Sequence, residues 1–213
     1  MNLILMGAPG AGKGTQSERI SEKWNIPAIS TGDVFRSAIK AGTELGAQAK
    51  IYIDEGQLVP DEIAIGIVKE YLSAGAFKNG FILDGFPRSI PQAEALEEMG
   101  IKVDCVLSLE IADEVIIKRM TGRRLCSGCG ISYHIEHKKP VKENICDKCG
   151  SSLYIRSDDA AETVINRLET FHARTEPLKV FYEAKGLLKC VSGEAGVDET
   201  TALVFKTLEE IGA

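Results

Sequence analysis

The sequence lacks any long hydrophobic run. Within its 213 residues no stretch approaches the roughly 18 to 20 consecutive apolar residues of a membrane-spanning helix. Residues 1–6 are mostly apolar but carry no basic leader and are too few for a signal peptide. We therefore expect a cytoplasmic protein without membrane contact, and we expect its six cysteines to be reduced.

An excess of positive charge is also lacking. The net charge is −6, which argues against nucleic acid as a partner. Internal repeats and low-complexity tracts are absent, and nothing suggests an exposed apolar seam, so we expect a monomer. A chain of this length that is 44% hydrophobic suffices for one sizeable core and a small accessory module.

Short apolar segments of high β-propensity alternate with amphipathic helical segments. The predicted strands are residues 3–6, 27–30, 81–83, 103–109 and 188–191. The predicted helices are residues 16–24, 61–74, 90–99, 112–121, 160–185 and 200–211, with two more at 34–41 and 46–55. This alternation predicts an α/β fold, a five-stranded parallel sheet with helices on both faces.

A glycine-rich loop, Gly7 to Thr15, follows the first predicted strand and precedes a helix. Its glycines let backbone N–H groups point inward around an anion, and Lys13 adds a mobile cation. The usual pattern G-x-x-x-x-G-K-[ST] has a hydroxyl residue where this chain has Gly14. Either Thr15 takes that role or the metal is held mostly through waters. The loop predicts a cradle for nucleotide phosphates.

Polar motifs follow the next two strands as well. Thr31-Gly32-Asp33 follows the second strand and Asp84-Gly85-Phe86-Pro87-Arg88 follows the third. Carboxyl ends of parallel strands share one edge, so these loops should meet in one crevice. Asp33 and Asp84 are candidates to hold Mg²⁺ through waters. The alternative for each is a helix cap or turn residue, and Asp33 would suit an N-cap. The amide of Gln92, one helical turn past Arg88, is placed to recognise a base edge.

Four cysteines form the pattern Cys126-x-x-Cys129 and Cys146-x-x-Cys149, typical of a four-thiolate zinc site. A segment of about 35 residues cannot bury enough apolar surface to fold alone, so we assign the metal a structural role. Iron or cobalt would also fit. We expect His134 and His137 to be surface or stacking residues. Cys105 and Cys190 are predicted to be small buried residues of strands.

Arginines are placed for phosphoryl transfer, which needs aligned phosphates, excluded water and neutralised charge. The candidates are Arg36, Arg88, Arg119, Arg123, Arg124, Arg156 and Arg167. Of the adjacent acids Asp158 and Asp159, we expect one to cap the helix beginning near residue 160 and the other to pair with an arginine.

Together these motifs resemble the adenylate kinases, specifically the long-lid bacterial type with a zinc-binding lid. The matching elements are the glycine loop 7–15, residues 30–33 with Arg36, residues 84–88 with Gln92, residues 121–124, the four cysteines, and residues 156–159 with Arg167-Leu168. Gly14, which departs from the general phosphate-loop pattern, agrees with this family. The resemblance implies reversible phosphoryl transfer from Mg-ATP to AMP, giving two ADP.

The resemblance also implies residue roles. The ATP-binding residues would be Gly10, Ala11, Gly12, Lys13, Gly14, Thr15, Arg119, Arg123, Ser132, Tyr133 and Ala195. The AMP-binding residues would be Thr31, Arg36, Gln57, Leu58, Val59, Gly85, Phe86, Pro87, Arg88, Gln92, Arg156 and Arg167. The catalytic cations would be Lys13, Arg88, Arg123, Arg156 and Arg167.

The implied organisation has three parts. A core of residues 1–29, 60–121 and 160–213 would carry an AMP-binding flap (30–59) and a zinc-binding lid (122–159). Alternatives are a kinase for another monophosphate, such as UMP or CMP, a switch-type or motor NTPase, and a zinc-ribbon nucleic-acid-binding module. The first usually has a short lid without cysteines, the second needs no second phosphate loop, and the acidic body argues against the third.

Overall fold

A five-stranded parallel sheet forms the centre of the computed structural model, which describes residues 1–55, 57–75, 77, 79–156 and 159–212. In spatial order its strands are β2 (Ala28–Ser30), β3 (Phe81–Asp84), β1 (Asn2–Gly7), β4 (Cys105–Glu110) and β8 (Leu188–Ser192). In the central strand, Leu3 lies opposite Ile82 on one side and Cys105 on the other. All five predicted strands are confirmed.

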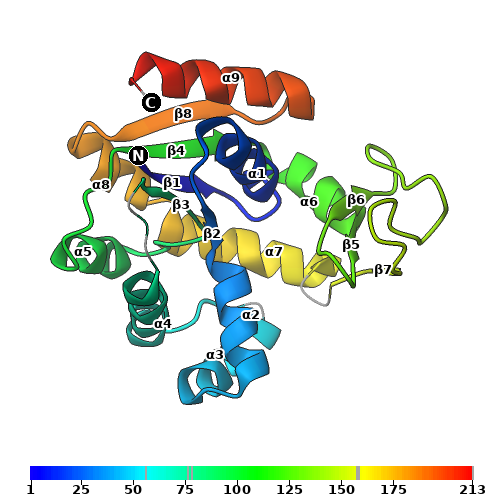
Figure 1. The fold of residues 1–213 in the computed structure, drawn as a ribbon, viewed down its shortest axis with the longest axis horizontal. Coiled ribbons are helices and arrows are strands. Elements are labelled where there is room, and N and C mark those ends of the chain that lie inside the picture. Colours follow the sequence, from blue (N-terminus) through cyan, green and yellow to red (C-terminus); the bar gives the residue numbers. More distant parts are fainter. Residues whose placement is uncertain (56, 76, 78, 157–158, 213) are drawn as a thin grey trace.

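Helices cover both faces of this sheet (Figure 1). They are α1 (Lys13–Trp24), α2 (Thr31–Ala41), α3 (Glu44–Asp54), α4 (Asp61–Ala74), α5 (Ile90–Glu98), α6 (Asp113–Thr121), α7 (Ala161–Thr170), α8 (Leu178–Ala184) and α9 (Val197–Glu210). Alternate β1 residues face opposite layers: Leu3 joins a cluster with Ile20 of α1 and Val204 of α9, whereas Ile4 joins a cluster with α4, α5 and α8.

The predicted helical stretch 160–185 is divided. After α7 the chain widens into a π-helical turn, Phe171–Thr175, and resumes as α8. The N–H of Glu176 donates to the carbonyl of Phe171 at 2.9 Å, a bond that spans five residues. Pro177 has no N–H to donate, and its ring would clash with the carbonyl four residues earlier in a regular α-helix.

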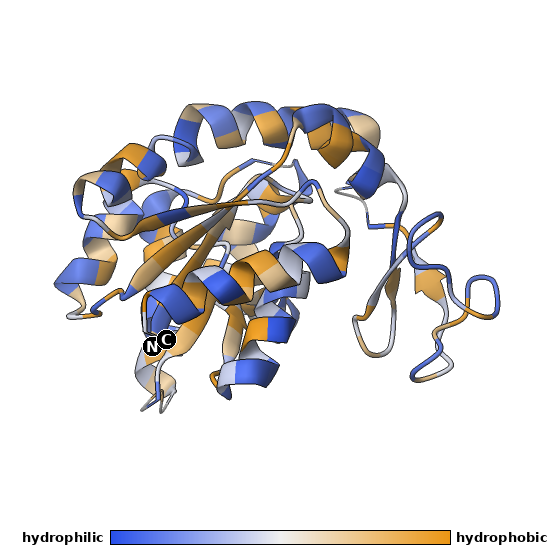
Figure 2. Cartoon of the chain, turned by 90° about the horizontal axis from the view of Figure 1, so that it is seen from above, coloured by the Kyte–Doolittle hydropathy of each residue, from blue (hydrophilic) through white to orange (hydrophobic). Residues whose placement is uncertain are grey.

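A second, three-stranded sheet stands apart from the core (Figures 1 and 2). It is antiparallel, in the order β6 (Ser132–His134), β5 (Arg123–Cys126) and β7 (Leu153–Tyr154). Its buried cluster comprises Cys126, Tyr133 and Cys146, with Ile131 and Leu153 packed against it. This core is small, as expected for a module that needs a cross-link.

The two cysteines outside this module differ in burial. Cys105 is buried in β4, as predicted, and burial raises the pKa of its thiol to about 11. The prediction for Cys190 is wrong, because its side chain is exposed. It lies on β8, an edge strand that the flanking helices leave partly uncovered. None of the helices in the described residues combines the length and the apolar character of a membrane span.

Candidate functional site

Three loops meet at the carboxyl ends of the central strands, as the sequence predicts. Asp84 ends β3 in register with Leu5 of β1 and Ser30 of β2. The Thr31 hydroxyl, at the start of α2, donates to the carbonyl oxygen of Asp84 at 3.0 Å. Parallel register therefore brings the loops after β1, β2 and β3 to one edge of the sheet.

The glycine loop is shorter than predicted, because α1 begins at Lys13 and not at Gln16. Gly12, the N-cap, has a φ of 96°, in a left-handed region that other residues rarely adopt. Gly10 is sterically required: a Cβ there would lie 2.6 Å from Cγ of Met120. With Lys13, Gly14 and Thr15 in the first helical turn, their N–H groups have no acceptor within the helix and are available to an anion.

Lys13 folds back over the loop. Its Nζ donates to the carbonyls of Gly7 at 2.7 Å and Ala8 at 2.9 Å. Desolvation in the cleft lowers the pKa of Lys13 to about 8; Asp84 opposes this shift, while Arg88 and two other arginines add to it. Lys13 therefore lies in a strongly cationic field with one neighbouring carboxylate, an environment that favours phosphate.

The lowered pKa of Lys13 predicts a pH dependence. The resemblance assigns Lys13 to ATP. Because Lys13 loses its proton as pH rises through about 8, we expect kcat/KM for ATP to fall above that pH. The measurement is kcat/KM for ATP between pH 6 and 10 at AMP concentrations well below its KM, so that the unliganded protein is the reacting form. In Lys13→Arg, whatever activity remains should lack this descending limb. A wild-type profile that is flat to pH 10 would contradict the assignment.

Asp84 faces the first turn of α1. A Cβ at Gly14 would lie 3.7 Å from Oδ2 of Asp84, while Thr15 is exposed one residue further along. Burial raises the pKa of Asp84, and the charges of Lys13 and Arg88 oppose the shift. This carboxylate beside the phosphate loop offers the oxygen ligands that Mg²⁺ prefers, directly or through water.

An open cleft of about 1150 Å³, counting its solvent-filled mouth, joins the phosphate loop to the α2–α3 region. Twelve of the predicted site residues line it: Lys13, Arg36, Gln57, Leu58, Val59, Gly85, Phe86, Pro87, Arg88, Gln92, Arg156 and Arg167. Thus all but Thr31 of the residues that the resemblance assigned to AMP come together. Thr31 is fully buried beside the cleft, bonded to Asp84.

Asp33 lies in the first turn of α2 and contacts Arg36. Nε of Arg36 donates to Oδ1 of Asp33 at 3.2 Å. Partial burial opposes ionisation, but this guanidinium outweighs it and holds the pKa of Asp33 below its usual value, with a further contribution from Arg156. The helix cap comes from Ser30, whose hydroxyl accepts from the Asp33 N–H at 3.3 Å. The alternative reading of Asp33 as the cap residue is therefore wrong.

Arg119 and Ala195, which the resemblance assigned to ATP, meet outside the residues that line this cleft. Arg119 donates to the carbonyls of Gly193 at 2.9 Å and Glu194 at 3.3 Å, directly before Ala195. Arg123 forms two bonds with Asp159, one of them from Nε to Oδ2 at 2.8 Å. The predicted pairing of an acid with an arginine of the three-stranded module thus involves Asp159. Asp158 lies outside the described residues.

Two predicted residues of the three-stranded module lie on β6. Ser132 is partly buried, and the ring of Tyr133 is buried against the cysteines. The Tyr133 hydroxyl donates to Sγ of Cys146 at 3.5 Å and accepts from the N–H of Asp147 at 2.8 Å. The side chain of Tyr133 is therefore committed to the cysteine cluster, and any contact with a nucleotide falls to its backbone.

Several cleft residues carry no sequence signal. Phe35, Ala64 and Phe171 line the cleft but are indistinguishable in sequence from core residues of amphipathic helices. Thr175 also lines it, and its hydroxyl donates to the carbonyl of Arg88 at 3.0 Å. Its position depends on the π-turn, which the sequence pattern does not reveal.

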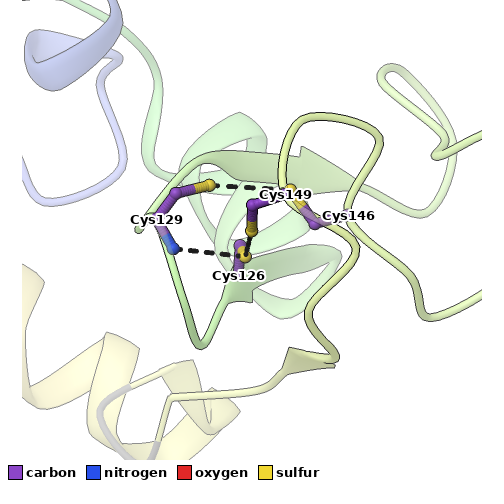
Figure 3. A group of neighbouring side chains, drawn as sticks. All are labelled: Cys126, Cys129, Cys146 and Cys149. Carbon is purple, nitrogen blue, oxygen red and sulfur yellow. Dashed lines mark hydrogen bonds between the residues drawn. The ribbon is translucent and has the colours of Figure 1, made fainter.

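The four cysteines of the second sheet converge (Figure 3). Their sulfur atoms lie within 4.8 Å of one another, with Cys126–Cys149 at 3.3 Å and Cys129–Cys146 at 3.6 Å. A tetrahedral four-thiolate zinc site has sulfur atoms about 3.8 Å apart, so this cluster fits the ion. The Tyr133 hydroxyl donates to Sγ of Cys146 and so stabilises its thiolate, the form that binds metal.

The histidines nearby are not arranged as ligands of this cluster. The rings of His134 and His137 stack with centroids 4.6 Å apart, as predicted for stacking residues. Nδ1 of His134 accepts from the N–H groups of Glu136 and His137 at 3.0 and 3.2 Å, and its Nε2 is buried. His134, Glu136 and His137 form a second group of possible ligands, whose ligand atoms lie within 4.8 Å of one another, separate from the four cysteines.

Comparisons with known proteins agree with this geometry. A profile of the family described as Adenylate kinase matches residues 5–187. The chain is similar to adenylate kinases from Acetivibrio thermocellus (57% identity, 99% of both chains), Caldicellulosiruptor bescii (56%, 98% of this chain and 99% of the other) and Bacillus cytotoxicus (56%, 95% of both chains). A phosphate loop, a cationic cleft and this likeness over nearly the full length lead to one conclusion: the chain belongs to the adenylate kinase family.

Proposed function

We propose that the cleft beside α2 and α3 binds AMP and that the phosphate loop, together with Arg119 and Ala195, binds ATP. Membership of the family identifies the chain as a phosphotransferase, with ATP and AMP giving two ADP. The observation that carries the division into two sites is the placement of Lys13: it belongs to the phosphate loop and also lines the cleft. Phosphates approaching from the two sides would meet there.

Charge neutralisation is the chemistry that these residues supply. The transferring phosphoryl group spreads negative charge over its oxygens, so fixed cations stabilise it. Arg88, Arg123 and Arg167 all act electrostatically on Lys13, and Arg156 acts on Asp33, which supports one shared cationic field. Arg88 is well oriented for this role, because its Nε donates to the carbonyl of Gly85 at 2.7 Å.

Two ions belong to the proposal. Adenylate kinases use Mg-ATP, and the carboxylates of Asp84 and Asp33 would hold Mg²⁺ through waters, where it neutralises phosphate charge. The four cysteines would hold Zn²⁺ as a structural ion, because four sulfur ligands leave no position for a reacting water.

The three-part organisation is also proposed: a core of residues 1–29, 60–121 and 160–213, an AMP-binding flap at 30–59 and a lid at 122–159. The flap would correspond to α2 and α3, and the lid to the three-stranded sheet. Closure of both over the substrates would exclude water, so that phosphate passes to AMP and is not hydrolysed. One chain holds both sites, so a monomer suffices, and the reduced thiolates suit the cytoplasm.

A coupled assay with four acceptors tests this function. We expect ADP formation from ATP with AMP at a kcat/KM at least about 10²-fold above that with CMP, UMP or GMP, because a hydrogen-bonding pocket rejects mismatched bases. Phosphate release from ATP alone should be negligible. Equal phosphate release without acceptor would indicate an NTPase, and preference for CMP or UMP another monophosphate kinase.

A further inference from the structure

The side-chain amide of Gln92 is held at both ends by groups of fixed hydrogen-bonding character. We propose that Asp61 is a positioning residue that locks this amide in one of its two orientations and thereby makes the cleft select adenine over a 6-oxopurine. The proposal rests on the assignment of the cleft to AMP. Gln92 is one of the residues that line the cleft. Asp61, the first residue of α4, is not among them and contacts Gln92 from outside that lining.

Two short hydrogen bonds define the orientation. Nε2 of Gln92 donates to Oδ1 of Asp61 at 2.7 Å, and Oε1 of Gln92 accepts from the backbone N–H of Arg88 at 2.7 Å. The Ser89 hydroxyl donates to the same Asp61 oxygen at 2.7 Å and accepts from the Gln92 N–H at 3.4 Å. Asp61 therefore receives two donors, one of them from the N-cap residue of α5.

The chemistry of the partners forbids the opposite orientation. A carboxylate offers acceptors and a backbone N–H offers a donor, whereas the two ends of an amide exchange roles when it rotates by 180°. In the rotated state, Oε1 of Gln92 would face Oδ1 of Asp61 and the amide NH₂ would face the N–H of Arg88. Both bonds would be lost and replaced by repulsive contacts. Gln92 as a residue is only 2% exposed, so water has little access to replace these bonds.

The locked amide matches adenine. After the internal bonds described above, Nε2 keeps one donor hydrogen and Oε1 keeps one lone pair. Adenine presents an acceptor at N1 and a donor at its 6-amino group, which pair with an amide N–H and C=O respectively. Hypoxanthine presents the reverse, a donor at N1–H and an acceptor at O6, and would require the rotated amide. A freely rotating amide would serve both bases, and a locked one serves adenine.

Asp61→Asn tests the lock, since asparagine is isosteric and can turn either its oxygen or its NH₂ toward Gln92. The measured quantity is kcat/KM for AMP divided by that for IMP, which differs from AMP at N1 and the 6-position without adding a bulky group. We expect this ratio to fall by about tenfold or more, mainly through KM, with kcat for AMP changing less than threefold. Asp61→Ala, which removes the acceptor altogether, should move the ratio in the same direction.

Glu62→Gln is the matched control. Glu62 lies in the same first turn of α4 and is exposed, so the variant removes an equal charge from the helix N-terminus without touching Gln92. Its AMP-to-IMP ratio should equal that of the wild type. Melting curves of all variants report any general loss of stability, which would lower both kcat/KM values together and leave their ratio unchanged.

Gln92→Leu tests the proposed AMP site independently of the lock. It should raise KM for AMP at least about tenfold while KM for ATP stays within about threefold. If KM for AMP does not move, the base does not contact Gln92, and the proposed AMP site and the lock both fail. If Gln92→Leu raises KM for AMP but the Asp61 variants keep the wild-type AMP-to-IMP ratio, the AMP site stands and the lock is overturned.

Discussion

Replacing Lys13 with alanine should lower kcat by at least about 10³-fold without lowering the melting temperature. Lys13 is the cation of the phosphate loop, and removal of a single preorganised group from a charge-stabilising site costs about 10² to 10³ in kcat. The larger figure is expected here because Lys13 lies where the two proposed phosphate sites meet. The measurements are steady-state ADP formation and thermal unfolding of the same preparation.

The unchanged stability follows from the lowered pKa of Lys13. A folded-state pKa of about 8, below the ordinary value of 10.5, means that folding disfavours the charged form of this lysine at neutral pH. Removing the charge relieves this cost and offsets the loss of the two hydrogen bonds from Nζ to the carbonyls of Gly7 and Ala8, so the free energy of unfolding should change little. Lys13→Met, which retains much of the apolar stem, is the matched control for packing and should be as inactive as the alanine variant. Turnover within tenfold of the wild type in either variant would refute the role of Lys13.

The parts of the fold that the sequence predicts are those governed by local pattern. Five apolar segments become the five strands, and the glycine loop lies between β1 and α1 as its spacing indicates. The predicted start of α1 is three residues too late. Gly14 has a low helix propensity, so the sequence pattern does not indicate a helix there, although the folded structure has one. The exposure of Cys190 depends on which strand lies at the sheet edge, a property of topology.

The residues proposed to contact substrate can be predicted from the sequence, whereas the residues that hold them in position cannot. Arg88 and Gln92 are found from their place after a strand, but the groups that fix them come from distant segments. Thr175 contacts Arg88 across 87 positions, and Asp61 contacts Gln92 across 31. Such long-range contacts produce no periodic pattern in the sequence. A threonine within a helical segment, such as Thr175, or an aspartate at a helix start, such as Asp61, is expected from local structure alone and so does not indicate a distant partner.

Removing the proposed zinc ion should unfold the proposed lid, residues 122–159, while the core stays folded. The lid buries a cluster of three residues with two more packed against it, so its folding depends on the thiolate cross-link. Structural zinc contributes about 10 to 16 kcal/mol of apparent binding free energy at neutral pH, more than such a small core can replace. A thiol-competent chelator should therefore lower kcat by about 10²-fold, because Arg123 is displaced, and should lower the melting temperature.

Thiol titration distinguishes lid unfolding from general damage. In the metal-loaded protein the exposed Cys190 should react rapidly and the buried Cys105 slowly, whereas the four ligand thiols should react only after chelation. Cys190→Ser is the control and should keep activity, metal content and melting temperature. Cys126→Ser with Cys146→Ser should reproduce the chelated state without chelator. If the four thiols react rapidly before chelation, or the melting curve ignores both treatments, the lid does not depend on a metal, and the close approach of its sulfur atoms needs another explanation.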